Sequence, residues 1–296
     1  MTIIPRRAAP LNPTSRDPYF DKIQFWVHSP LDRKTLAGLR KQCGRGGLYV
    51  DNRPARFDRR YRQRIEFKQP SDQALRWLAR HDDALINRAE VTIDLVFKSW
   101  AERDDAFDFL HHHLVRRWHG KRQQIRVYKA EDERTSAGTR YDAGRWAANR
   151  IVFYREEHSR ITGELASLHL EWRLNGLKAV RSAGIESGQD LLEFDHRQFW
   201  QKRLLLYEVD CQRLGRLIRN CLSGKRSRVS VIKQTSGYRV NIDGRTGETH
   251  RRVAGTVQEL IDSFQRVRER VRVKRALSPL SNETLLPEVV SRVSHE

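Results

Sequence analysis

Three short segments of the chain, at residues 87–97, 149–154 and 168–174, alternate apolar and polar residues. Because successive side chains of a β-strand point to opposite faces, this alternation predicts strands with one apolar and one polar face. An apolar sheet face has to be covered, and helical patterns lie between and after these strands. We therefore predict an α+β fold with a central, mainly antiparallel sheet that carries helices on one face.

Capping signals and periodicity divide the rest of the chain. Capping boxes at Ser99-x-x-Glu102 and Thr256-x-x-Glu259 predict helix starts, and Ser29 is a further candidate cap. Beyond residue 190 the pattern becomes mainly helical and basic. We expect four segments: a flexible N-terminal arm, an α+β catalytic domain, a helical basic DNA-binding part and a tail, at residues 1–18, 19–186, 187–280 and 281–296.

The composition excludes wholesale disorder and a helical membrane protein. Hydrophobic residues make up 38% of the 296-residue chain, which is enough to bury a core. The strongly apolar clusters, such as Leu204-Leu205-Leu206, are far shorter than the ~18 residues of a spanning helix. The start of the chain shows no apolar secretory segment, and the three cysteines lack metal-ligand or disulfide spacing. We therefore predict a cytoplasmic protein without membrane contact.

The formal net charge of +20 is unevenly distributed. Residues 33–64 carry eleven basic and two acidic residues, residues 65–124 are neutral, and residues 223–276 carry fourteen basic and five acidic residues. Two basic flanks around a neutral middle favour a folded core with arms that bind a polyanion. The candidate nucleic-acid-binding residues in these flanks are Arg59, Arg60, Arg62, Lys225, Arg226, Arg228, Arg266, Arg268, Arg270, Arg272, Lys274 and Arg275.

The polar faces of the three predicted strands carry ionisable groups. The residues that share these faces are Glu90, Thr92 and Asp94 in the first strand, Arg150 and Tyr154 in the second, and His169, Glu171 and Arg173 in the third. A half-solvated antiparallel sheet alternates in the same way without any function. Tyrosine, histidine and arginine beside central carboxylates are nevertheless better suited to phosphate chemistry than ordinary surface residues are.

This set of residues is suited to phosphoryl transfer to a tyrosine. A phenol with a pKa near ~10 is a poor nucleophile at neutral pH unless nearby cations or a metal favour its ionised form. Glu90, His169 and Glu171 could hold Mg²⁺ or Mn²⁺, which would polarise the phosphate. Arg150 and Arg173 could bind the phosphate oxygens.

Three motifs carry a resemblance to a known family. They are Asn-Arg-Ala-Glu-Val-Thr-Ile at 87–93, Asn-Arg-Ile-Val-Phe-Tyr-Arg-Glu-Glu at 149–157, and Leu-His-Leu-Glu-Trp-Arg-Leu at 168–174 followed by Ala183-Gly184-Ile185. In order and spacing, residues 64–186 resemble the replication initiators of rolling-circle plasmids and filamentous phages, especially the phage gene II-type proteins. The chain departs from the family at Arg155-Glu156, where a lysine usually follows two residues after the tyrosine, so Arg155 is a candidate substitute.

The resemblance implies a rolling-circle initiator that nicks and rejoins one DNA strand at an origin, single-stranded or hairpin, through a covalent 5′-phosphotyrosine. Tyr154 would be the nucleophile, and Glu90 and Glu171 would be metal or acid–base groups. The chain has no ATP-binding loop of the Walker type. Host helicase, polymerase and single-strand-binding protein are therefore the expected partners. The oligomeric state stays open, with a homodimer as one option.

Alternatives remain for the nucleophile and for the function. Tyr128 and Tyr141 are rival nucleophiles, but only Tyr154 shares the face of a well-patterned strand with Arg150. A non-catalytic origin- or operator-binding protein would keep the basic flanks without an active site. An RNA-binding protein that uses the open sheet face is the third hypothesis.

Overall fold

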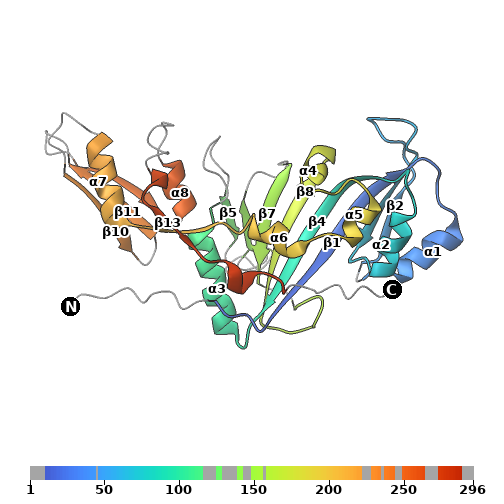
Figure 1. Cartoon of the computed structure of the whole chain (residues 1–296), viewed down its shortest axis with the longest axis horizontal. Helices are drawn as coiled ribbons and strands as arrows, with labels where there is room; N and C mark the ends of the chain where they lie inside the picture. The colour runs from blue at the N-terminus through green and yellow to red at the C-terminus, as the bar shows by residue number, and fades with distance from the viewer. Residues whose placement is uncertain are drawn as a thin grey trace. The chain divides into compact units, whose positions relative to one another are not determined.

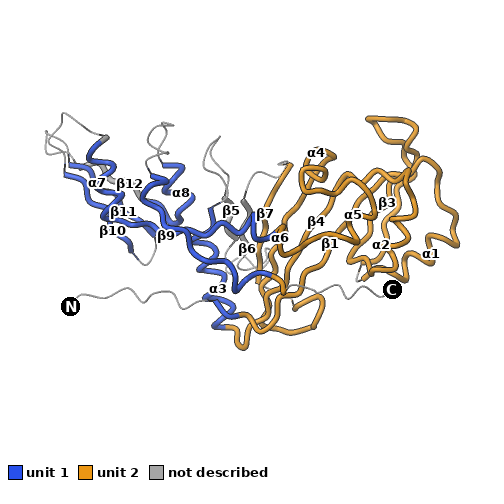
Figure 2. The backbone as a smooth tube through the Cα atoms, in the orientation of Figure 1, with its two compact units in different colours: residues 1–12, 101–123, 200–286 blue, residues 13–100, 124–199, 287–296 orange. Residues whose placement is uncertain are grey.

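The structure is a computed structural model, and it describes residues 11–44, 46–115, 125–128, 139–142, 148–155, 158–221, 228–234, 237–243, 249–263 and 273–288. At residues 125–128, 139–142, 221 and 249–253 only the backbone is described. The chain forms two compact units (Figure 2). The larger unit comprises residues 13–100, 124–199 and 287–296, and the smaller unit comprises residues 1–12, 101–123 and 200–286. Neither unit is continuous in sequence.

The larger unit is built on an eight-stranded antiparallel sheet with the order β2-β3-β1-β4-β8-β7-β6-β5 (Figure 1). Its strands are β1 (Ser15–Val27), β2 (Leu48–Asp51), β3 (Gln63–Lys68), β4 (Leu85–Val96), β5 (Ile125–Tyr128), β6 (Thr139–Asp142), β7 (Asn149–Tyr154) and β8 (Ser167–Asn175). The three strands predicted from alternation are β4, β7 and β8, and they are direct neighbours in the sheet. The predicted α+β class with an antiparallel central sheet is confirmed.

Local capping chemistry sets the helix starts of the larger unit. Its helices are α1 (Arg33–Lys41), α2 (Asp72–Ala79), α4 (Leu177–Arg181), α5 (Gly188–Leu192) and α6 (His196–Gln201), the last of which ends in the smaller unit. Asp32, rather than the predicted Ser29, caps α1, because its carboxylate accepts the backbone N–H groups of Lys34 and Thr35 at 2.8 and 2.9 Å.

Helices cover the apolar face of the sheet. Trp77 of α2 packs against Phe25 and Phe67, and Phe199 of α6 meets Trp172 of β8 edge-on at 6.3 Å. Helix α5 lies against α2 at Gly188, where a Cβ atom would stand 2.5 Å from the α2 backbone. Glycine is therefore required at this position for the two helices to approach so closely.

The smaller unit has a separate core. It contains α3 (Trp100–His113, except its first residue), β9 (Leu206–Val209), α7 (Cys211–Cys221), β10 (Arg228–Gln234), β11 (Gly237–Asp243), β12 (Thr249–Ala254), α8 (Val257–Asp262), β13 (Leu277–Leu280) and a 3₁₀ turn (Glu283–Leu285). Strands β10, β11 and β12 form an antiparallel sheet, and β9 pairs with β13. Leu214 and Ile218 of α7 pack with Val229, Val240 and other buried residues of this unit.

This part of the chain contains more strand than the mainly helical segment predicted from its pattern. The pattern beyond residue 190 predicts a helix through Leu205 and Leu206, but β9 begins at Leu206. A short apolar run does not distinguish a strand from a helical segment, because it is too short to show a period of either 2 or 3.6 residues. The capping box at Thr256 and Glu259 is confirmed at the start of α8. Among the described helices, none has both the length and the apolar character to cross a membrane.

Candidate active site

The strand register brings the predicted polar residues of β4 and β8 onto one face. The cross-strand pairs are Glu90 with Arg173, Thr92 with Glu171, and Asp94 with His169. Residues directly opposite each other in an antiparallel pair point to the same side of the sheet. Two strands that lie far apart in sequence therefore form one polar surface.

Strand β7 extends this surface on the other side of β8. Tyr154 lies opposite His169, and Arg150 lies opposite Arg173. Val152 occupies the position between Arg150 and Tyr154, opposite Glu171. Because β4, β8 and β7 are neighbours, the polar faces predicted for these three strands merge into one surface.

The hydroxyl of Tyr154 has both a carboxylate and a guanidinium partner. It donates a hydrogen bond of 2.5 Å to Oε1 of Glu171, and it accepts one of 3.2 Å from Arg160. The ring stacks on the imidazole of His169, with 4.9 Å between the centroids and an interplanar angle of 19°. Only 8% of Tyr154 is exposed. The phenol is thus held in one orientation between a proton acceptor and a positive charge.

Burial changes the acidity of Glu171. Removal of the carboxyl from water raises its pKa above the ordinary value, and this effect exceeds the opposing effect of the Arg173 guanidinium. The neighbouring charge of Glu90 raises the pKa further. Arg173 donates to Oε2 of Glu171 at 2.8 and 2.5 Å, while Tyr154 binds Oε1. A carboxylate with a raised pKa is a stronger base, which suits it to accept the phenolic proton.

Asp94 forms the second centre of the polar face. Its carboxylate accepts hydrogen bonds from the Tyr19 hydroxyl at 3.0 Å, the Ser159 hydroxyl at 3.0 Å and the backbone N–H of Arg160 at 2.8 Å. Nδ1 of His169 lies 2.7 Å from Oδ1 of the same carboxylate. Asp94 is fully buried, so these contacts replace the water that it lost on folding.

Tyr19 of β1 is a second tyrosine near Tyr154, and it is partly buried. Burial raises the pKa of Tyr19, and the Asp94 carboxylate raises it further. The phenol of Tyr19 therefore stays protonated and serves as a hydrogen-bond donor to Asp94. This environment makes Tyr19 a poor nucleophile, in contrast to Tyr154, whose hydroxyl accepts a hydrogen bond from Arg160.

Glu90 lies among cations at the other end of the face. Its carboxylate is 2.5 Å from Arg88, 3.6 Å from Arg173 and 3.8 Å from Lys22. Arg173 bridges Glu90 and Glu171, so the two predicted carboxylates are linked through a guanidinium. This ion-pair network offsets part of the desolvation of the two buried carboxylates.

The three predicted metal ligands do not form a cation site as they are arranged. Both oxygens of Glu171 accept protein hydrogen bonds, Glu90 faces three cations, and Nδ1 of His169 is directed to Asp94. Within the described part of the chain, no group of three or more acidic, histidine or cysteine residues is arranged to hold a metal ion. The binding of Mg²⁺ or Mn²⁺ therefore stays a prediction from the sequence.

The rival tyrosines lie on other strands of the same sheet, and the basic candidates lie in other parts of the chain. Tyr128 lies in β5 and Tyr141 in β6, opposite Val152 in the register, and the side chains of both lie outside the described residues. The basic candidates that lie outside the described residues are Lys225, Arg226, Arg266, Arg268, Arg270 and Arg272. The exposed basic candidates are Arg59, Arg60 and Arg62 between β2 and β3, Arg228 at the start of β10, and Lys274 and Arg275 before β13.

Two contributors to this site were not among the predicted site residues. Asp94 shares the period-two pattern of Glu90, so the alternation was sufficient to identify it. Arg160 lies in the β7–β8 connection, where Ser159 N–H bonds to the Glu164 carbonyl and Gly163 adopts a φ of 77°. Because loops have no periodicity, no pattern in the sequence indicated that Arg160 would reach Tyr154.

No protein-family model matches this sequence, and no curated protein matches it. Among solved structures, the chain is similar to a rolling circle replication initiator protein from Geobacillus stearothermophilus. That similarity has 11% sequence identity and a TM-score of 0.31, and it covers 60% of this chain and 80% of that chain. A similarity of this size assigns neither the family nor the activity, which must be argued from the site.

Proposed function

We propose that this protein is a DNA strand nickase and rejoiner of the rolling-circle initiator type, with Tyr154 as the nucleophile. The observation that carries the proposal is the pair of contacts at the Tyr154 hydroxyl. Glu171, a base with a raised pKa, lies 2.5 Å away, and the Arg160 guanidinium lies 3.2 Å away. A tyrosine activated in this way can attack a phosphodiester.

The proposed step transfers the phosphorus of one phosphodiester from a 3′-oxygen to the tyrosine oxygen. The phenolic oxygen of Tyr154 attacks phosphorus while its proton moves to Glu171, and the bond between phosphorus and the 3′-oxygen breaks. The leaving 3′-oxygen takes a proton from water and becomes a free 3′-hydroxyl. The products are a 5′-phosphotyrosyl protein and a 3′ end that can prime synthesis. Reversal of the step rejoins the strand.

The cations of the site have distinct proposed roles. Arg160 lowers the cost of negative charge on the phenolic oxygen, because its guanidinium already contacts that atom. Arg173 positions Glu171 through two N–H groups. Arg150 is proposed to bind the phosphate, as the sequence predicted. A divalent cation enters none of these steps, so reactions with Mn²⁺ and with a chelator are compared in the test.

The test is the detection of a covalent protein–DNA adduct. Labelled single-stranded DNA with candidate origin sequences is incubated with the protein, in parallel with Mn²⁺ and with a chelator, and each mixture is resolved on a denaturing gel. We expect a shifted protein–DNA band with wild type, none with Tyr154→Phe, and an unchanged band with the control Tyr207→Phe. The phenylalanine variant keeps the ring stacked on His169 and loses only the hydroxyl. An adduct that persists in Tyr154→Phe would exclude Tyr154 as the nucleophile.

A second candidate function is DNA binding without catalysis. The specific observation in its favour is burial, because Tyr154 is only 8% exposed and the carboxylates nearby are paired with cations. In that case the polar face would hold the strands together, and wild type would give no adduct with DNA from any replicon. The buried face is also poorly suited to the third hypothesis, which needs exposed aromatic residues to stack on RNA bases.

A further inference from the structure

The loop at residues 52–62 between β2 and β3, here called the arginine loop, carries arginines in two different states. Arg53 and Arg60 are each bound by the acidic residue two positions earlier, with N···O distances of 2.8 Å to Asp51 and 2.7 Å to Asp58. The hydrogen bond from Arg53 lowers the pKa of Asp51 to about 2, and that from Arg60 lowers the pKa of Asp58. The positive charge of these two arginines is therefore already matched, by Asp51 at the end of β2 and by Asp58 within the loop.

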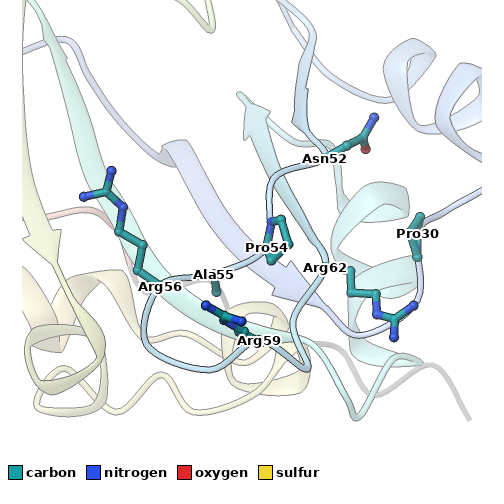
Figure 3. Close-up of a pocket in the computed structure, with 7 residues that line it drawn as sticks. All are labelled: Pro30, Asn52, Pro54, Ala55, Arg56, Arg59 and Arg62. Carbon is teal, nitrogen blue, oxygen red and sulfur yellow. The ribbon is translucent and has the colours of Figure 1, made fainter.

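The other three arginines of this loop are exposed, and among the described residues none of them has a carboxylate partner. Arg56, Arg59 and Arg62 line an open pocket of about 800 Å³ together with Pro30, Asn52, Pro54 and Ala55 (Figure 3). The guanidinium groups of these arginines occupy three separate places around the pocket (Figure 3). Three separate guanidinium groups fit successive phosphates of a chain better than they fit one isolated phosphate.

The loop is held in place by buried contacts. Gln63, which is 2% exposed, accepts a hydrogen bond from the Leu31 N–H at 2.9 Å and donates one to the Asn52 side chain at 2.8 Å. Ala55 is buried, and its N–H donates to the Tyr61 carbonyl at 2.9 Å. A loop that is already ordered loses little conformational entropy on binding, so its arginines can contribute to affinity.

An exposed aromatic ring lies in the same loop. Phe57 is 54% exposed although it is a large apolar residue, and it lies between Arg56 and Arg59 in the chain. Its ring packs edge-on against Trp26, with 5.7 Å between centroids and an interplanar angle of 89°. This contact orients the ring, and the exposed part of it can stack on an unpaired base.

We propose that the arginine loop binds single-stranded DNA, with consecutive phosphates at Arg56, Arg59 and Arg62 and a base stacked on Phe57. The choice of DNA rests on the proposed function, whereas the choice of a single strand rests on Phe57. In a duplex the bases are stacked on one another and cannot use such a ring. The paired Arg60, which the sequence predicted as a binding residue, would contribute less than its neighbours.

The experiment compares two double variants that remove the same charge. Arg59→Ala with Arg62→Ala removes the unpaired arginines, and Arg53→Ala with Arg60→Ala removes the paired ones. Each pair is made in full-length Tyr154→Phe protein, which cannot form the proposed adduct. Fluorescence anisotropy measures binding to labelled dT₂₀, to a duplex of equal length and to U₂₀ RNA over a range of salt concentrations.

We expect the unpaired double variant to bind dT₂₀ about tenfold or more weakly, with a salt slope that is smaller by about 1.4, since each phosphate contact contributes ~0.7. The paired double variant should change the affinity by less than about twofold. Phe57→Ala should weaken dT₂₀ binding by about 5- to 100-fold, and Phe57→Leu should not restore it, because leucine has no ring face.

Three outcomes would overturn the proposal. Equal losses in both double variants would mean that only total charge matters. Tighter binding of the Tyr154→Phe parent to the duplex or to the RNA would exclude the single-stranded DNA assignment. An unchanged affinity in Phe57→Ala would exclude stacking. Because binding is measured without cleavage, a failed adduct assay alongside the expected binding losses would reject the nickase and keep the binding site.

Discussion

The polar face of the central sheet and the arginine loop are both rich in charged residues, but they differ in whether those residues are buried and paired. On the sheet, Glu90 and Glu171 are buried and bound by arginines. In the loop, Arg56, Arg59 and Arg62 are exposed and line an open pocket. The two regions lie in the same unit, and β3 begins immediately after the loop.

The difference shows what burial does to a charged residue. A buried charge without a partner costs several kcal/mol, so the sheet must supply opposite charges and hydrogen bonds for every carboxylate. Water stabilises an exposed arginine, so the loop can leave guanidinium groups available for a ligand. We therefore assign chemistry to the buried face and affinity to the loop.

The largest expected effect is on stability, at Asp94. Replacement by alanine leaves the Tyr19 and Ser159 hydroxyls, the Arg160 N–H and the His169 imidazole without their acceptor. We expect a loss of about 3–5 kcal/mol in the free energy of unfolding, measured by urea denaturation. The control Asp58→Ala, in the exposed pair with Arg60, should leave the midpoint unchanged. Equal midpoints for the two variants would mean that the buried network contributes no stability.

The next effect is on catalysis, at Glu171. Glu171→Gln keeps the shape of the side chain but cannot take the phenolic proton, so adduct formation should slow by about 10²- to 10⁴-fold. The exposed Glu164→Gln serves as the matched control and should form adduct at the wild-type rate. Rates come from quenched time courses with labelled single-stranded DNA. A wild-type rate in Glu171→Gln would leave Tyr154 without a base in this site.

Removal of the Arg160 guanidinium, which contacts the Tyr154 hydroxyl, should slow adduct formation by a smaller factor. Arg160→Gln loses the 3.2 Å contact to the phenolic oxygen, and we expect adduct formation to slow by about 10²-fold. Arg160→Gln also loses the ion pair with Asp21. The fold should persist, because the backbone N–H of Arg160 still donates to Asp94 and Gln69 still donates to Asp21. Arg181→Gln, on the exposed face of α4, removes the same charge and should have no effect. Equal rates in the two variants would contradict a role for Arg160 in charge stabilisation.

The raised pKa of Glu171 also predicts a pH dependence of stability. A carboxyl whose pKa is higher in the folded state favours the fold most when protonated, below its ordinary pKa of ~4.3. This contribution is lost as the pH rises toward the folded-state pKa, by up to about 1.4 kcal/mol per pH unit. The stability of wild type relative to Glu171→Gln should therefore fall from pH 4 upward. A flat difference between the two proteins would contradict the raised pKa.

The smallest expected effect is on the free energy of unfolding, when an exposed arginine of the arginine loop is replaced. Arg59→Ala should change the free energy of unfolding by no more than about 0.5 kcal/mol, because the side chain is exposed and makes no described ion pair. Thermal unfolding of the variant beside wild type measures this. A larger loss would mean that Arg59 supports the loop itself, which would weaken its assignment to ligand binding.

Much of the sheet was predictable, and much of the site was not. Alternation identified β4, β7 and β8 and the face that holds Tyr154 and Glu171, because the period of two is a local property. The contact between Tyr154 and Arg160 depends on a loop that returns to the strand it left. Strands β9 and β13 of the smaller unit were missed, since they pair with each other across about 70 residues of sequence.

The sequence by itself determined which residues are charged, which strands have two different faces, and that tyrosine, carboxylates and arginines occur in them. Only the tertiary structure decided which of those charges meet. Strand order made β4, β8 and β7 neighbours, burial raised the pKa of Glu171, and short-range acids matched Arg53 and Arg60 but not Arg59. The physical reason is that the energy of a charge depends on its distance from other charges and from water, and a linear pattern specifies neither of these.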